Sequence, residues 1–150
     1  MAENDQPGET TQFLQKMDGQ LLGWAHPAAH LREALDCDQF RLYAQPVVEL
    51  RQESAAPGGI AMAEVLVRLR EDEARMLPPG DFLPACELYR MMAEVDRWVV
   101  GHALKMLGRG GGLRKLSVNV SGQAIEEPGF ASFVAAQLRA VSLDPASLVI

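Results

Sequence analysis

The sequence is poor in the features that mark membrane, secreted and nucleic-acid-binding proteins. None of its apolar runs approaches the ~18–20 residues of a membrane-spanning helix, and its first residues, MAENDQPGETTQ, lack the pattern of a signal peptide. Its two cysteines, Cys37 and Cys86, show the spacing of neither a zinc site nor a disulfide framework. Acidic residues outnumber basic ones by 20 to 14, which gives a net charge of −6. We therefore expect a cytoplasmic protein with reduced thiols, no membrane contact and no binding to a nucleic acid polymer.

What the chain does contain is an alternation of strand and helix patterns after a polar beginning. We expect residues 1–30 to form a partly disordered lead-in and residues 31–150 to form one domain. Strands that alternate with helices indicate an α/β fold with mostly parallel pairing. The expected elements are a helix over 30–39, strands over 40–50 and 60–69, a loop over 51–59, largely helical structure over 78–109, a strand over 113–121, a helix over 128–141 and a strand start at 147–150.

The helical region and the last residues carry more specific expectations. Pro84 is expected to open a helical segment, because proline is tolerated in a first turn. The glycine-rich stretch GRGGGL follows a helix and precedes a strand, the reverse of the order in a phosphate-binding loop, and is interpreted as a helix end. The final SLVI has the pattern of a buried strand, so we expect the sequence to be cut within that strand. An apolar stripe at helical spacing indicates core: Met92, Val95, Val99, Ala103 and Met106.

The stretch AEVLVRL, residues 63–69, carries two charges among aliphatic side chains. Because successive side chains of a strand point to opposite faces, Glu64, Leu66 and Arg68 share one face and Ala63 and Val65 belong to the other. An unpaired buried charge is costly, so an open two-sided sheet would leave both charges badly placed. A barrel would place them in its interior near one mouth, where a ligand or metal can satisfy them.

Asn119, in the strand pattern LSVNVS, adds a second polar group of the same kind. Its neutral oxygen suits a hard cation such as Mg²⁺. Two interpretations stay open from the residues alone. Glu64 and Asn119 form half of a metal site, or they form a hydrogen-bonded polar pair in a partly wet barrel.

Four segments, in their order and spacing, resemble the EAL family, the cyclic-di-GMP phosphodiesterase domains of bacteria: FRLYAQPVVEL, AEVLVRL, FLPACELYRMMAEVDRWVV and LSVNVS. The resemblance runs from about Leu31 to Ile150. It implies the family's (β/α)8 TIM-type barrel, in which the first strand runs antiparallel to the others. The chain would supply the N-terminal half of that barrel, truncated in the fourth strand.

The resemblance also implies metal ligands. Glu64 begins EVL where the family's signature Glu-Ala-Leu begins, with Val65 in place of the alanine, and it resembles a ligand of the catalytic metal. Asn119 matches the family's metal-binding asparagine. The implied cofactor is Mg²⁺ or Mn²⁺.

Three further residues match positions that contact the cyclic dinucleotide: Gln45, Leu66 and Arg68. The planar guanidinium of Arg68 suits a phosphate or a guanine edge. Gln45 lies in the family's tyrosine-x-Gln-Pro pattern, where Tyr43 is present and Ala44 replaces a frequent second tyrosine.

The reaction implied by the resemblance is hydrolysis of one phosphodiester bond of cyclic di-GMP to linear pGpG, assisted by two metal ions. In the family, the remaining metal-binding carboxylates and a lysine follow a segment like SLVI, and this sequence does not contain them. We therefore expect the isolated chain to be inactive. Three interpretations stay open: a piece of an active phosphodiesterase, a catalytically inactive cyclic-di-GMP-binding module, or an interaction module that pairs with a second copy or a complementing half-barrel.

Overall fold

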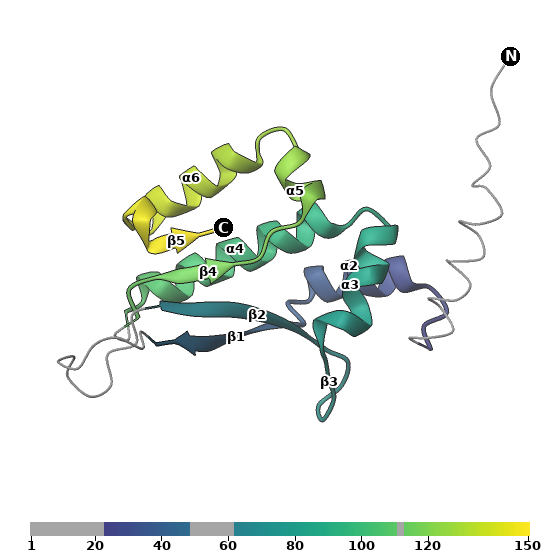
Figure 1. Cartoon of the computed structure of the whole chain (residues 1–150). Coiled ribbons are helices and arrows are strands. Elements are labelled where there is room, and N and C mark those ends of the chain that lie inside the picture. The colour runs from purple at the N-terminus through teal and green to yellow at the C-terminus, as the bar shows by residue number, and fades with distance from the viewer. Residues whose placement is uncertain (1–22, 49–61, 111–112) are drawn as a thin grey trace, which may run out of the picture.

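The computed structural model describes residues 23–48, 62–110 and 113–150 (Figure 1). The greater part of the expected lead-in, the loop over 51–59 and part of the glycine-rich stretch lie outside the described residues. The helices are α2 (Pro27–Asp36), α3 (Pro79–Leu88), α4 (Met92–Gly108), α5 (Gly122–Glu126) and α6 (Phe130–Ala140), with a 3₁₀ turn η1 (Pro145–Ser147). The strands are β1 (Phe40–Val47), β2 (Met62–Arg70), β3 (Met76–Leu77), β4 (Leu116–Val118) and β5 (Leu148–Val149).

The strands form one sheet with the order β1-β2-β4-β5. β1 pairs antiparallel with β2, from Phe40 opposite Leu69 to Val47 opposite Met62. β2 and β4, and then β4 and β5, pair in parallel. These pairings confirm the predicted α/β fold, in which the first strand runs antiparallel to β2, β4 and β5.

A short strand that the sequence did not predict extends the sheet beside β2. β3 pairs antiparallel with the end of β2, with Leu77 opposite Leu69. The turn between them is built by Asp72, whose Oδ1 accepts hydrogen bonds from the backbone N–H groups of Ala74 and Arg75 at 2.8 and 2.9 Å. The charged run Glu71-Asp72-Glu73 has the composition of a solvated connection, and through Asp72 it also turns the chain back onto the sheet.

One hydrophobic core lies between the helices and one face of the sheet. On β2 the alternation is clear, since Ala63, Val65 and Leu69 are buried and the residues between them are not. The long helix α4 runs alongside β4 (Figure 1). The apolar stripe predicted for α4 lines this core: Met92, Val95, Val99, Ala103 and Met106.

The helical region predicted over 78–109 is two helices, and Pro84 does not open either of them. α3 begins at Pro79, where proline occupies the first helical position, and Pro84 lies inside the helix. α3 then ends at Leu88, and the chain turns at Arg90, which has a left-handed φ of 55°. The sequence has no glycine or proline between the two helices, so no residue signalled the break.

Left-handed residues other than glycine follow three of the helices: Asp38 after α2, Arg90 after α3 and Ser142 after α6. Each helix end has the same hydrogen-bond pattern. After α3, the N–H of Met91 donates to the carbonyl of Cys86 at 2.8 Å, so the last turn closes back on itself. The left-handed conformation is unfavourable for a residue other than glycine. It is accepted here because it lets the last carbonyls of the helix accept hydrogen bonds.

The region after β4 contains one helix more than predicted. α5 is only five residues long and begins at Gly122, after Ser121 as its N-cap. α6 was expected over 128–141 and spans Phe130–Ala140. Its N-cap is Gly129, which has a φ of 89°. The apolar spacing of this segment predicts that Phe130, Phe133, Val134 and Leu138 face inward; the first, third and fourth are buried and Phe133 packs against the core.

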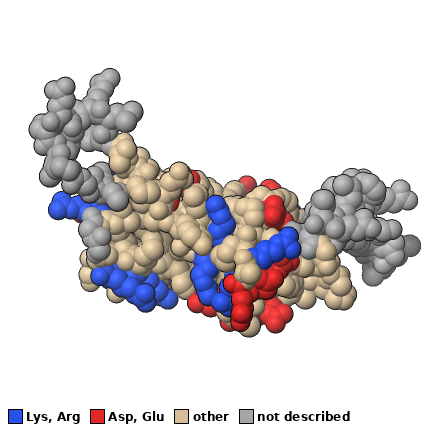
Figure 2. Space-filling view, turned by 90° about the horizontal axis from the view of Figure 1, so that it is seen from below, with Lys and Arg blue, Asp and Glu red and all other residues tan. Residues whose placement is uncertain are grey.

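The surface carries mixed charge. Figure 2 shows Lys and Arg side chains in separate groups on one face, with Asp and Glu side chains gathered beside some of them. Within residues 23–48, 62–110 and 113–150, no helix is long and apolar enough to cross a membrane.

Candidate functional site

β2 presents its polar residues on the sheet face opposite the core. Glu64, Leu66 and Arg68 are half-buried, whereas Ala63 and Val65 on the other face are 2% and 4% exposed. The strand alternation that the sequence predicted is therefore present. It places one carboxylate and one guanidinium on the same side of the sheet.

Three strands bring polar side chains together around Glu64. Gln45 of β1 lies directly opposite Glu64 in the antiparallel register, and Ser117 of β4 lies beside it in the parallel register. Asn119 follows directly after the last residue of β4, and its Nδ2 donates a hydrogen bond of 2.8 Å to Oε1 of Glu64. The two predicted metal ligands are thus in direct contact.

The three predicted dinucleotide contacts share one open hollow of about 420 Å³. Its walls come from residues 43–46 of β1, from Leu66 and Arg68 of β2, and from Met76 of β3. The guanidinium carbon of Arg68 lies 6.0 Å from the centre of the Tyr43 ring, and its Nη1 donates to the Val67 carbonyl at 2.9 Å. The hollow therefore combines an aromatic ring, an amide and a cation.

Four residues that line the hollow were absent from the predicted site: Tyr43, Ala44, Pro46 and Met76. Tyr43 lies two positions before Gln45, so strand alternation places both side chains on one face, and that rule could have found it. Met76 belongs to the two-residue β3, for which the sequence gives no signal beyond the charged run before it.

Asp96, outside the hollow, is another residue that sequence reasoning missed. It is the one charged residue among the buried residues of the described part of the chain, at 4% exposure. Burial raises the pKa of its carboxyl, against the opposing effect of hydrogen bonds from Ser121. One sequence feature could have identified Asp96: it is a carboxylate directly after Val95, within the apolar stripe predicted for the long helix.

The donor set at Glu64 and Asn119 fits part of a site for a hard cation. A carboxylate oxygen and an amide oxygen are ligands that Mg²⁺ and Mn²⁺ accept, but Mg²⁺ requires six. Within the three described ranges, no group of three or more His, Cys, Asp or Glu residues is arranged to hold a metal ion. Two ligands alone do not complete a coordination shell.

Comparisons with known proteins agree on one family. The family model described as the EAL domain matches residues 28–150. The uncharacterized protein Rv1354c of Mycobacterium tuberculosis is 34% identical over 124 residues, which are 79% of this chain and 19% of that protein. The cyclic di-GMP phosphodiesterase PdeB of Shewanella oneidensis is 29% identical over 113 residues, which are 73% of this chain and 13% of PdeB.

A solved structure extends the agreement to the fold. The EAL domain of Pseudomonas aeruginosa FimX, solved bound to c-di-GMP, superposes with a TM-score of 0.71 at 33% identity. The match covers 83% of this chain and 48% of the FimX chain. The present chain therefore spans about half of that structure and less than a fifth of the two sequence relatives.

Proposed function

The chain belongs to the EAL domain family, and from that premise we propose that it forms the part of a cyclic di-GMP phosphodiesterase that contacts the dinucleotide and supplies two metal ligands. The observation that carries the proposal is the convergence of β1, β2 and the end of β4. Glu64 contacts Asn119 and faces Gln45 across the β1–β2 ladder, and Arg68 lines the adjoining hollow.

The side chains of the hollow suit an anionic, aromatic ligand. Arg68 offers a planar set of N–H donors that matches a phosphate or the edge of guanine. Gln45 offers an amide that both donates and accepts hydrogen bonds. Because the chain carries a net charge of −6, an anionic ligand needs such a local cation, or bound metal ions, to approach.

Hydrolysis of cyclic di-GMP to pGpG adds one water across a P–O3′ bond. The hydroxide part joins phosphorus, the bond to O3′ breaks, and O3′ takes up a proton. Mg²⁺ or Mn²⁺, when bound, activates the water and stabilises the charge that develops on the phosphate. Glu64 and Asn119 would hold the ion, the hydrogen bond between them orients the carboxylate, and Arg68 compensates charge on the phosphate.

We propose that the isolated 150-residue chain binds cyclic di-GMP weakly and does not hydrolyse it. Glu64 is the single carboxylate of the proposed metal site within the described residues, and a two-metal mechanism requires several. This is the behaviour of a binding module, the second candidate function. Full activity would need further carboxylates from a longer protein or from another chain.

The test is to measure binding by isothermal titration of cyclic di-GMP into the purified chain, with Mg²⁺ present, for three proteins. We expect Arg68→Ala to weaken binding roughly tenfold or more, as for loss of a charge-assisted hydrogen bond. Arg41→Ala is the matched control, because Arg41 lies directly opposite Arg68 in the register but does not line the hollow. Its guanidinium donates to the carbonyls of Asp38 and Phe40, and its loss should change affinity no more than about twofold.

Two results would contradict this proposal. An equal loss of affinity in both arginine variants would indicate general charge attraction instead of contact in the hollow. Formation of pGpG by the purified chain, dependent on Mg²⁺ and abolished in Glu64→Ala, would show that the chain is an enzyme by itself.

A further inference from the structure

Asp96 has an unusual environment for a carboxylate of a long helix. It lies in the first half of α4, faces the core and is 4% exposed. The Oδ2 of Asp96 accepts two hydrogen bonds, both from Ser121. The backbone N–H of Ser121 lies at 2.9 Å and the Ser121 hydroxyl at 2.6 Å. Burying a carboxylate is costly unless it is hydrogen-bonded, and the two Ser121 donors supply those hydrogen bonds.

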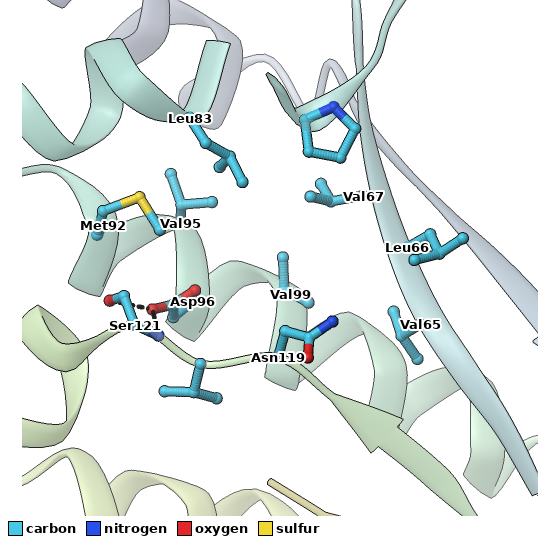
Figure 3. A pocket seen from close by; sticks show the side chains of 12 residues that line it. Val65, Leu66, Val67, Leu83, Met92, Val95, Asp96, Val99, Asn119 and Ser121 are labelled. Atoms are coloured by element: carbon cyan, nitrogen blue, oxygen red, sulfur yellow. Dashed lines mark hydrogen bonds between the residues drawn. The ribbon is translucent and has the colours of Figure 1, made fainter. Parts of the chain in front are cut away.

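Ser121 links Asp96 to the next helix. Its hydroxyl oxygen accepts a hydrogen bond of 3.2 Å from the N–H of Ala124, and so it caps α5 while it donates to Asp96. The start of α5 and the chain before it are thereby tied to α4. Figure 3 shows this Asp96–Ser121 contact at one side of a cavity of about 260 Å³, with β2 at the other side.

Asn119 lies between these two sides. The β4 ladder ends at Val118, so Asn119 and Val120 connect the last paired residue of the sheet to Ser121. Asn119 lines the same cavity and reaches Oε1 of Glu64 at 2.8 Å. The position of its amide therefore depends on two fixed points: the sheet at Val118 and the Asp96 contact at Ser121.

We propose that Asp96 is a positioning residue for the site: by holding Ser121, it sets the place at which the Asn119 amide meets Glu64. That Glu64 and Asn119 bind metal rests on the proposed function. The placement of Asn119 by Asp96 does not, because it concerns the chain without any ligand.

Nuclear magnetic resonance of the full chain tests the proposal through the side-chain amide signals of Asn119, identified by their loss in Asn119→Asp. We expect Asp96→Ala to shift these signals and to make their exchange with solvent about tenfold faster, because the segment that holds Asn119 opens more often. Asp96→Asn keeps a side-chain oxygen for the Ser121 N–H and should restore most of the original signal. This rescue separates positioning from the loss of a charge.

Asp144→Ala is the matched control. Asp144 also accepts a hydrogen bond from a backbone N–H, that of Ala146 at 2.8 Å, but it caps η1 and does not line the Asn119 cavity. This variant should leave the Asn119 signals unchanged. If Asp96→Ala does not fold, Ser121→Ala removes only the hydroxyl and should still move them.

A folded Asp96→Ala protein with unchanged Asn119 signals would overturn the proposal, and so would an equal change in Asp144→Ala. If Asp96→Ala does not fold, unchanged signals in a folded Ser121→Ala protein would overturn it as well. Addition of Mn²⁺ to the unmodified chain examines the proposed function separately. Broadening of the Asn119 signals at low Mn²⁺ supports metal ligation, and its absence counts against that role while leaving the placement by Asp96 intact.

Discussion

The two cysteines occupy opposite environments at the scale of single residues. Cys86, on α3, is 0% exposed, and burial raises the pKa of its thiol from 9.0 to about 12. Cys37, after α2, is exposed. Since the thiolate is the reactive form, the two residues should differ in reactivity although both are free thiols.

We predict that a thiol reagent such as dithiobisnitrobenzoate modifies one cysteine of the native chain at pH 8 within minutes, and the second only after unfolding. Cys37→Ala should abolish the fast reaction, and Cys86→Ala should leave it intact. Fast modification of two thiols in the native protein would contradict the burial of Cys86.

The pKa of Cys86 also predicts a loss of stability at alkaline pH. Between pH 9 and 12 the unfolded chain releases the Cys86 proton and the folded chain retains it, so the free energy of unfolding falls as pH rises. The slope contributed by this thiol is up to about 1.4 kcal/mol per pH unit. Urea unfolding from pH 8 to 10.5 should show a shallower decline for Cys86→Ala than for Cys37→Ala, and equal slopes would contradict the prediction.

Strand alternation, a purely local rule, was enough to group Glu64, Leu66 and Arg68 on one face. The strand pattern of LSVNVS also singled out Asn119, and the family resemblance added Gln45; the structure places both beside Glu64. Their roles on metal and ligand stay predictions. The Asp96–Ser121 contact could not be read from the sequence, because it depends on how α4 packs against a turn 25 positions away.

At the scale of elements, the ends of helices differed most from expectation. The break between α3 and α4 was missed because its left-handed residue is Arg90, and local rules expect glycine there. Pro84 was expected to open a helix because proline is tolerated in a first turn, yet it lies in the interior of α3. α5 and β3 span five and two residues, which is too short for a periodic signal.

We predict that glycine at the left-handed helix ends stabilises the protein. Ser142→Gly and Arg90→Gly should each raise the free energy of unfolding by about 1 kcal/mol, because both positions have positive φ. Gly129→Ala is the reverse control. Its φ is 89° and a Cβ added there would meet no atom within 4 Å, so backbone strain alone should lower stability by a similar amount. Chemical denaturation measures the free energy of unfolding of all three variants. A loss of stability in both Ser142→Gly and Arg90→Gly would contradict the prediction.

At the scale of the whole molecule, one core cluster joins helices and sheet from Leu31 of α2 to Leu138 of α6. A single shared core favours cooperative unfolding. The second half of the fold is nevertheless partly open. A hollow of about 480 Å³, mostly apolar, lies beside α6 and is lined by residues that include Phe130, Val134 and Ile150.

We predict that the described part of the chain unfolds in one transition. Trp24 lies before α2 and Trp98 lies on α4, so their fluorescence reports on two separate elements, while circular dichroism reports on all helices. Urea curves from single-tryptophan variants Trp24→Phe and Trp98→Phe should coincide with the dichroism curve of each variant. Separate midpoints would indicate that the elements unfold independently.

The predicted pairing with a second copy or a complementing half-barrel stays a prediction. The molar mass of the purified chain, measured by light scattering across a range of concentrations, distinguishes a monomer from a dimer. A constant mass near 16.4 kDa would count against self-pairing.

The alternation along β2 has a practical consequence for engineering. Positions 64, 66 and 68 face the hollow and its polar neighbours, whereas 63, 65 and 69 face the core. A combinatorial library at the first three positions can explore new ligand preferences while thermal tolerance is retained. A library at the second three changes side chains of the core and is expected to act mainly on thermal stability. One nine-residue strand thus carries ligand recognition on one face and core packing on the other, and each can be varied in directed evolution.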